Sequence, residues 1–188
     1  VSLYIPKFNG WVDSLGAKKN IRIVDLLTHT SGLPPYAPVS ELEKKSGSPN
    51  PAGLIAYLST CKRDFEPQTK FQYSCLNYIT LQNIIETVSG KSLRDFAKNN
   101  IFDVLGMAHT DYQPQGETLS RTAPTEKQKD GTVLRGIVHD PLARIMNGGI
   151  SGNAGLFSDA NDIGILVAAL QNNGEWKGKR ILSPLGVK

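Results

Sequence analysis

The feature that most constrains the fold of this chain is a periodic apolar run over residues 76–88. Gly90 follows the run, at the place where a left-handed glycine commonly ends a helix. Spacings of three and four residues place the apolar side chains largely on one stripe, which predicts an amphipathic helix with one buried face. The stripe comprises Ile79, Leu81, Ile84, Ile85 and Val88.

Five further segments carry helical signals. They cover residues 21–27, 51–61, 92–101, 140–145 and 160–171. Asn50 and Pro51 have the residue types of an N-cap and a first helical position, and Asp140 with Pro141 repeats that pair. The sequence SLRD from Ser92 has the character of a capping box.

Two stretches do not carry a helical pattern. Residues 37–51 hold prolines, serines and a charge run, which predicts a surface loop. Residues 106–136 are polar and weakly periodic, which predicts an irregular region with short strands. Helical patterns outnumber strand patterns, so the predicted fold class is mainly α with a few short strands.

Composition excludes several classes of function. Twenty-one basic and 17 acidic residues give a net charge of +4, and the lysines are scattered without interleaved aromatic residues, which argues against a nucleic-acid partner. The longest apolar run, residues 165–170, is far shorter than the roughly 20 residues that cross a bilayer, so no membrane segment is predicted. The two cysteines leave the redox compartment open.

Metal and phosphate chemistry find little support in the sequence. His29, His109 and His139 lie far apart without acidic or cysteine partners at ligand spacing, so no metal site is predicted. The glycine-rich sequence NGGISGNAG, residues 147–155, contains no G-x-G-x-x-G pattern and no following P-loop lysine. We interpret it as a tight backbone bend.

Residues 59–62, Ser-Thr-Cys-Lys, match the S-x-x-K pattern, in which a lysine amine takes the proton of a nucleophilic serine. That chemistry favours a serine at a helix N-terminus, where the backbone N–H groups and the dipole stabilise the attacking oxygen. Ser59 instead lies at the end of a predicted helix. We therefore interpret this match as a coincidence.

Tyr73 is a stronger candidate for chemistry. It stands in FQYSC, just before the periodic run. A phenol with a pKa near ~10 is a poor base at neutral pH, but neighbouring ammonium groups stabilise the phenolate and bring it into use. Its role therefore depends on its surroundings.

Five phrases in the chain resemble the serine β-lactamase and penicillin-binding-protein-like family, of the class C β-lactamase and D-alanyl-D-alanine carboxypeptidase type. They occur in the order of that family and cover most of the chain. They are YIPKF (4–8), IRIVDLLTHTSGLP (21–34), PQTKFQYSCLNYITLQNIIETVSGKSL (67–93), IFDVLGMAHT (101–110) and GNAGLFSDANDI (152–163).

The resemblance implies a cleft built from three motifs: an S-x-x-K with the nucleophilic serine, a Y-x-N with the catalytic tyrosine, and a K-T-G or H-x-G strand. Tyr73 takes the catalytic position of the Y-x-N motif, and Cys75 stands at its substrate-binding asparagine position. A carboxamide donates and accepts hydrogen bonds, whereas a thiol does either only weakly. Cys75 therefore favours relaxed, esterase-like recognition or an inactive descendant.

The order of the motifs predicts that the nucleophile precedes Val1 and that the third motif follows Lys188. Residues 1–188 are accordingly interpreted as a single partial domain, the helical lobe of the β-lactamase/transpeptidase-like α+β fold. This chain alone is expected to be inactive and to self-associate.

The resemblance implies that the complete protein is a serine hydrolase that acts on a β-lactam, a D-Ala peptide or an ester, without metal or organic cofactor. It also implies a periplasmic or extracytoplasmic location. Two alternatives stay open: an inactive penicillin-binding-like domain for sensing or assembly, and a helical binding module.

Overall fold

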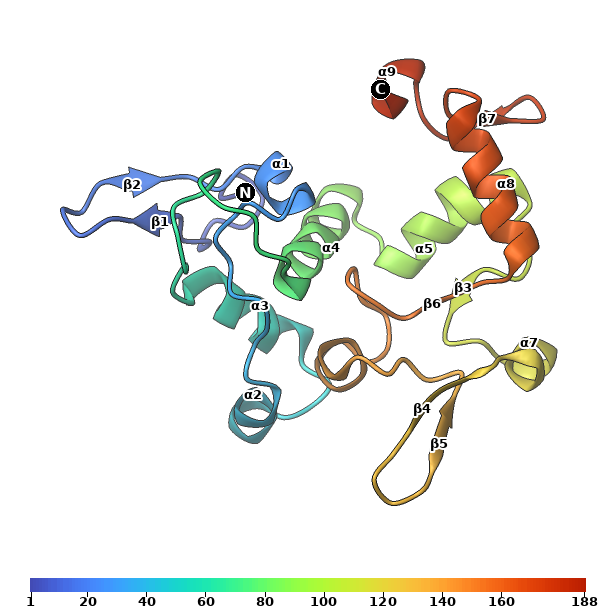
Figure 1. Ribbon diagram of the computed structural model, residues 1–188, viewed down its shortest axis with the longest axis horizontal. Helices are drawn as coiled ribbons and strands as arrows, with labels where there is room; N and C mark the ends of the chain where they lie inside the picture. The colour runs from blue at the N-terminus through green and yellow to red at the C-terminus, as the bar shows by residue number, and fades with distance from the viewer. The chain divides into compact units, whose positions relative to one another are not determined.

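The computed structural model describes residues 1–188, which form two compact units (Figure 1). The first unit comprises residues 1–91 and 139–155, and the second comprises residues 92–138 and 156–188. Each unit is therefore built from two separate stretches of the chain. The division does not test the interpretation of residues 1–188 as a single partial domain, which stays a prediction.

The first unit is helical, with one short antiparallel strand pair. Its helices are α1 (Ile23–Leu27), α2 (Val39–Ser46), α3 (Pro51–Thr60), α4 (Cys75–Ser89) and the π-helical turn η2 (Leu142–Met146). Its strands are β1 (Trp11–Val12) and β2 (Lys18–Lys19), with Trp11 opposite Lys19.

The second unit combines short helices with three antiparallel strand pairs (Figure 1). Its helices are α5 (Leu93–Ala97), the π-helical turn η1 (Lys98–Phe102), α6 (Asp103–Leu105), α7 (Gly116–Arg121), α8 (Ala160–Gln171) and α9 (Pro184–Val187). The pairs are β3 (Asp111–Tyr112) with β6 (Leu156–Phe157), β4 (Pro124–Lys127) with β5 (Val133–Arg135), and β7 (Glu175–Trp176) with β8 (Lys179–Arg180).

Helix α4 confirms the strongest helical prediction. The Ser74 hydroxyl accepts a hydrogen bond from the Leu76 nitrogen at 3.2 Å, and Gly90 ends the helix with φ +67°. The two ends thus follow the expected capping rules. The buried face differs from the predicted stripe, because the polar residues Asn77 and Thr80 are buried beside Leu76 and Ile79 while Val88 is 67% exposed.

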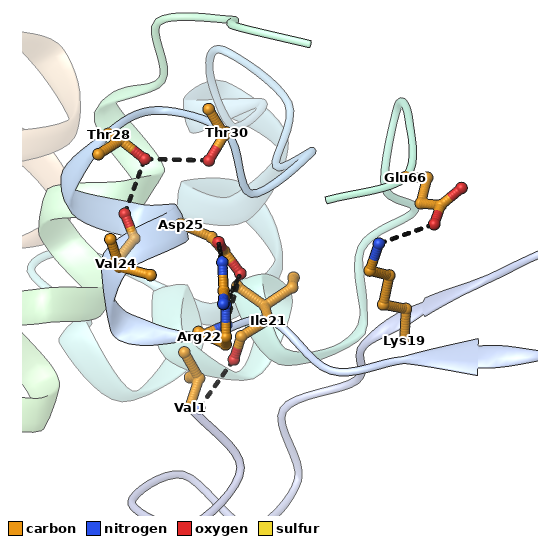
Figure 2. Close-up of polar contacts among 9 residues, drawn as sticks. All are labelled: Val1, Lys19, Ile21, Arg22, Val24, Asp25, Thr28, Thr30 and Glu66. Carbon is orange, nitrogen blue, oxygen red and sulfur yellow. Dashed lines mark hydrogen bonds and ion pairs between the residues drawn. The ribbon is translucent and has the colours of Figure 1, made fainter. Parts of the chain in front are cut away.

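Helix α1 is fixed at its start by a buried carboxylate (Figure 2). The Asp25 carboxylate accepts from the Arg22 backbone nitrogen at 2.8 Å and pairs with the Arg22 guanidinium at 3.0 Å. The Val1 nitrogen donates to the Ile21 carbonyl at 2.9 Å, so the first residues lie against this helix start. Acceptor groups at a helix N-terminus satisfy N–H groups that lack partners within the helix.

Helix α3 begins as predicted, with the Asn50 side chain accepting from the Gly53 nitrogen at 2.7 Å and Pro51 at the first helical position. The predicted helices over residues 21–27 and 160–171 are confirmed by α1 and α8.

Two helices correct the sequence reading. Residues 39–46, expected in a surface loop, form α2, and residues 116–121, expected in an irregular region, form α7. Helix α2 buries only Leu42, and α7 buries no residue. A helix with one apolar anchor produces almost no periodic apolar signal, so its pattern is that of a loop.

Each unit has its own hydrophobic core. In the first unit, Leu26, Leu54, Leu58, Leu76 and Leu142 are fully buried within one cluster. In the second, Phe102, Leu105, Met107 and Ala169 form a smaller cluster. No helix in the chain combines the length and the apolar character needed to cross a bilayer.

Candidate functional site

The residues of the Y-x-N-like motif lie at the start of α4. Tyr73 is 61% exposed, whereas Cys75 is 9% exposed. The Ser74 hydroxyl donates to the Pro34 carbonyl at 2.6 Å, and the Cys75 nitrogen donates to the Pro35 carbonyl at 3.1 Å. The proline-containing turn after α1 thus holds the backbone of the motif and leaves the phenol of Tyr73 at the surface.

His29 supports the same motif from the turn that follows α1. Its Nδ1 accepts from the Ser74 nitrogen at 3.3 Å and lies 2.9 Å from Asn77 Nδ2. The Ser31 hydroxyl donates to Asn77 Oδ1 at 2.6 Å, which makes the Asn77 nitrogen a donor and His29 Nδ1 an acceptor. The imidazole is therefore neutral with its proton on Nε2, and burial lowers the His29 pKa. The His29 and Tyr73 ring centroids are 4.6 Å apart.

A buried carboxylate lies beside the motif. Asp140 is 8% exposed and accepts hydrogen bonds from the Tyr36 hydroxyl, from the Ala143 nitrogen at 2.9 Å and from Asn153 Nδ2 at 3.1 Å. Burial and the Asp140 hydrogen bond raise the pKa of Tyr36 well above its usual range. Tyr36 is therefore a neutral hydrogen-bond donor at physiological pH.

The glycine-rich bend delivers Asn153 to this carboxylate. A Cβ on Gly152 would lie 2.1 Å from the Tyr78 carbonyl oxygen of α4, so only glycine lets the two backbones approach this closely. The Gly152 nitrogen donates to Gln82 Oε1 at 2.9 Å. Residues 147–155 thus contact α4 through backbone, which agrees with their interpretation as a bend.

Neighbouring groups shift the pKa values of Cys75 and Tyr73. Burial raises the pKa of the Cys75 thiol, and the nearby Asp140 charge adds to this effect, while Asn153 and Tyr73 act in the opposite direction. Cys75 in turn raises the pKa of the Tyr73 phenol, with burial and Asp140 contributing less. Both side chains are protonated near neutral pH, and Cys75 is consequently a poor nucleophile.

Ser59, the serine of the S-x-x-K match at residues 59–62, has a structural role. Ser59 is 3% exposed, and its hydroxyl donates to the Ile55 carbonyl of the same helix at 2.7 Å. Cys61 and Lys62 line a separate groove of about 570 Å³ beside β1 and β2. The hydroxyl of Ser59 is therefore committed within α3.

Three residues of types that can bind a metal ion lie together in the second unit. The donor atoms of His109, Asp159 and Asp162 are within 4.8 Å of one another. The hydrogen bonds of these residues have a structural explanation. Asp159 caps α8 by accepting from the Asp162 nitrogen at 2.9 Å and pairs with the His109 ring at 2.7 Å. Asp162 accepts from the His109 nitrogen and from the Thr110 hydroxyl, each at 2.8 Å. These residues join the start of α8 to the segment before β3.

Sequence reasoning did not identify three members of the site: Tyr36, Asp140 and Asn153. The sequence predicts Asp140 as a helix cap, and Asp140 does accept from the Ala143 nitrogen, but its other oxygen binds a tyrosine 104 residues away. Local patterns carry no signal for such a pair. Asn153 lies in a glycine-rich bend whose sequence indicates only its backbone conformation.

The fold of this chain is shared with a known class of protein. A penicillin binding protein from Bacillus halodurans matches with a TM-score of 0.64 and 21% identity, over 99% of this chain and 56% of that chain, which shows a shared fold. The chain belongs to the Beta-lactamase family, whose family model matches residues 1–186. The family predicted from the sequence is thereby confirmed.

Two curated relatives are similar at the level of sequence. An N-acetylmuramyl-L-alanine amidase of Bacillus subtilis is 34% identical over 94% of this chain and 44% of its own length. A Salmonella agona protein with the provisional name D-alanyl-D-alanine carboxypeptidase is 33% identical over 94% of this chain and 45% of its own length. The chain thus spans about half the length of these relatives.

Proposed function

We propose that the protein to which this chain belongs is a serine hydrolase that forms and hydrolyses an acyl-enzyme. The observation that carries the proposal is the family match over residues 1–186. Tyr73 would be the catalytic tyrosine, because residues 73–75 resemble the Y-x-N motif of that family. Tyr73 exposes its phenol while its neighbours Ser74 and Cys75 are buried. An accessible proton carrier on a fixed backbone is what general acid–base catalysis requires. Residues 1–188 would form the helical lobe of this enzyme.

Tyr73 would relay the proton between the nucleophilic serine and the leaving group. With its raised pKa, the Tyr73 phenol is protonated at neutral pH in this chain. Tyr73 is therefore suited to donate a proton. To act as a base it needs a cation beside it, because a neighbouring positive charge favours the phenolate. The lysine of the S-x-x-K motif would supply that charge.

The proposed substrate class is an amide bond next to alanine in a muramyl peptide. The relatives support this class, since the names of both describe hydrolysis of a bond to alanine. A β-lactam or a simple ester is the wider class that the same acyl-enzyme chemistry accepts. Cys75 would contact the substrate at the position of the motif asparagine.

An inactive penicillin-binding-like domain is the second candidate. Cys75 favours it, because a neutral thiol offers weak hydrogen bonds where the family motif has a carboxamide. Such a domain would bind a peptide or a partner without turnover.

The test uses the complete protein. It is incubated with a D-alanyl-D-alanine peptide, a muramyl-L-alanine amide, a chromogenic cephalosporin and a nitrophenyl ester, and product and intact mass are followed. The proposal expects product together with a transient mass increase on one serine. A stable adduct without turnover supports the inactive domain, and neither adduct nor product with any of the four compounds contradicts the proposal.

A further inference from the structure

The groove beside β1 and β2 has walls that are fixed to each other. Its volume of about 570 Å³ is in the range of small-molecule sites, and it is lined by the β1–β2 hairpin and by the residues that end and follow α3. Arg63 joins these walls, because its Nη2 donates to the Asn9 carbonyl at 2.7 Å and to the Leu58 carbonyl at 3.1 Å. The Lys19 ammonium pairs with Glu66 at 2.9 Å, which ties β2 to the segment after α3 (Figure 2). The groove is therefore preformed.

The lining of the groove carries more positive than negative charge. Its charged residues are Lys18, Lys62, Arg63 and Asp64. Lys18 and Lys62 are exposed, and neither forms an ion pair within the chain. Asp64 already accepts a hydrogen bond from Gln72 Nε2 at 2.7 Å. The two ammonium groups are thus available to an anionic ligand.

Arg63 adds a buried charge that has no carboxylate partner. It is 5% exposed, and its terminal nitrogens donate to backbone carbonyls and, at 2.9 Å, to the Cys61 sulfur. Its Nε has no hydrogen-bond partner. A buried cation without an anion is costly, because the attraction to an opposite charge does not offset its desolvation. An anion bound in the groove would reduce this cost.

The uncharged part of the lining suits a body larger than a single ion. Trp11 is half-buried and contributes an indole, which combines a large apolar surface with a polar N–H group. Asn9, Asn20 and Thr60 are exposed and contribute carboxamides and a hydroxyl. An aromatic ring with a few hydrogen-bonding groups is the usual composition of a small-molecule site. A hydroxylated ring that carries an anionic group matches this lining.

We propose that the groove binds a saccharide that carries a carboxylate or phosphate group, with the anion near Lys18 and Lys62 and the sugar ring at Trp11. Tyr73 does not line this groove, so the site is separate from the candidate catalytic residue. The choice of a muramyl sugar as one probe rests on the proposed function. The binding itself requires no catalytic step.

The test measures binding to the 188-residue chain by nuclear magnetic resonance. The chain has two tryptophans, and Trp176→Phe assigns the indole N–H signal of Trp11 by removing the other one. N-acetylmuramic acid and glucose 6-phosphate are the charged probes, while N-acetylglucosamine is the neutral sugar and inorganic phosphate is the free anion. Both charged sugars should shift the Trp11 signal, with dissociation constants at least about threefold below those of the neutral sugar and of phosphate.

Lys18→Gln and Lys62→Gln should each weaken the binding of the charged sugars about two- to fivefold, the range of an exposed ion pair, and leave the neutral sugar unaffected. The matched control replaces Lys44 and Lys45 by glutamine, because these are exposed lysines of α2 outside the groove. This control should bind like the unchanged chain.

Three results would overturn the proposal: an unmoved Trp11 signal, equal affinity of the charged sugars with the neutral sugar or with phosphate, or equal weakening in the groove and control variants. Each is read without turnover. A complete protein that binds these sugars but hydrolyses nothing would contradict the proposed function alone, and an active protein that does not bind them would contradict this site alone.

Discussion

Tyr73 and Cys75 lie near a buried carboxylate, and their phenol and thiol have raised pKa values and are protonated near neutral pH. The Asp140 charge contributes to the raised pKa of both groups, although Cys75 is the largest influence on Tyr73 and burial is the largest on Cys75. His29 on the other side of the motif is held neutral by two donors at Nδ1. At the residue scale the site is therefore a set of neutral donors and acceptors around one anion.

Tyr73→Phe in the complete protein removes the proton carrier while it keeps the ring. We expect kcat for the ester or amide substrate to fall roughly 10²- to 10⁴-fold, the usual contribution of a general acid–base group. Tyr78→Phe is the control, because the Tyr78 hydroxyl donates to the Leu27 carbonyl at 3.2 Å. Steady-state kinetics that are the same for the unchanged protein and for Tyr73→Phe would remove Tyr73 from the mechanism.

His29 makes stability depend on pH. Its folded-state pKa lies below the usual value near 6.5, so the unfolded chain binds the proton more readily than the folded chain. Stability is complete above that value and falls as the pH drops below it, since a protonated Nδ1 can no longer accept from Ser74 and Asn77. Urea unfolding midpoints between pH 5 and 8 should show this decline in the unchanged chain.

His29→Gln should remove the part of the decline that belongs to the imidazole. His139→Gln is the matched control, because His139 is exposed, and it should leave the decline in place. An undiminished pH dependence in His29→Gln would show that another group is responsible.

At the scale of elements, the contact between the glycine-rich bend and α4 brings residues far apart in sequence together. Gly152→Ala places a methyl group 2.1 Å from the Tyr78 carbonyl oxygen, and backbone on both sides must shift. We expect a loss of roughly 1–3 kcal/mol in the free energy of unfolding, the usual effect of overpacking. The loss is measured by urea unfolding.

Gly164→Ala in α8 provides the contrast. No atom lies within 4 Å of a Cβ built at Gly164. Alanine in an exposed helix interior is favoured over glycine by roughly 0.5–1 kcal/mol, so this variant should be more stable. Equal effects of the two substitutions would show that the bend does not constrain α4.

The sequence predicts elements well where local signals agree. Helices α3, α4 and α8 follow the apolar spacing, and the predicted cap of α3 at Asn50 is present. The structure adds capping contacts at Ser74 for α4 and at Asp159 for α8. Helices α2 and α7 escape prediction because neither buries an apolar face. Tyr73 and Cys75 were found through a family motif, whereas Asp140 and Asn153 join them only by tertiary contact.

For the whole molecule, the two units respond differently to acid. In the second unit Arg94 binds Asp111 through two hydrogen bonds, at 2.8 and 2.7 Å, and the guanidinium holds the Asp111 pKa below its usual range. This contribution is complete above the unfolded value near ~4 and is lost as the pH falls through the lower folded value. The loss lies well below the pH range in which His29 acts in the first unit.

The 188-residue chain by itself should show no acylation. Ser59 is buried with its hydroxyl bonded to its own helix, and the Ser74 hydroxyl is bonded to the Pro34 carbonyl, so neither is free to attack. Intact mass after incubation with a labelled penicillin and a nitrophenyl ester is expected to be unchanged. A stoichiometric adduct on Ser59 or Ser74 would refute this assignment.

Self-association of the chain stays a prediction. Leu3, Leu15 and Leu185 are each more than 80% exposed, and exposed apolar side chains favour association where they gather into a patch. Sedimentation velocity over a range of concentrations tests it, and a constant monomer mass up to high concentration would exclude it.

The division of the chain into interleaved stretches has a consequence for how sequences of this kind can diverge. Residues 92–138 belong wholly to the second unit, yet they separate α4 from the stretch that carries Asp140 and Asn153. For the first unit they are one long closed loop, and the entropy of closing a loop changes only slowly with its length. Related proteins can therefore lengthen, shorten or rebuild residues 92–138 with little effect on how Asp140 and Asn153 meet α4. Alignments of the family should show insertions and deletions in this segment, between α4 and Asp140.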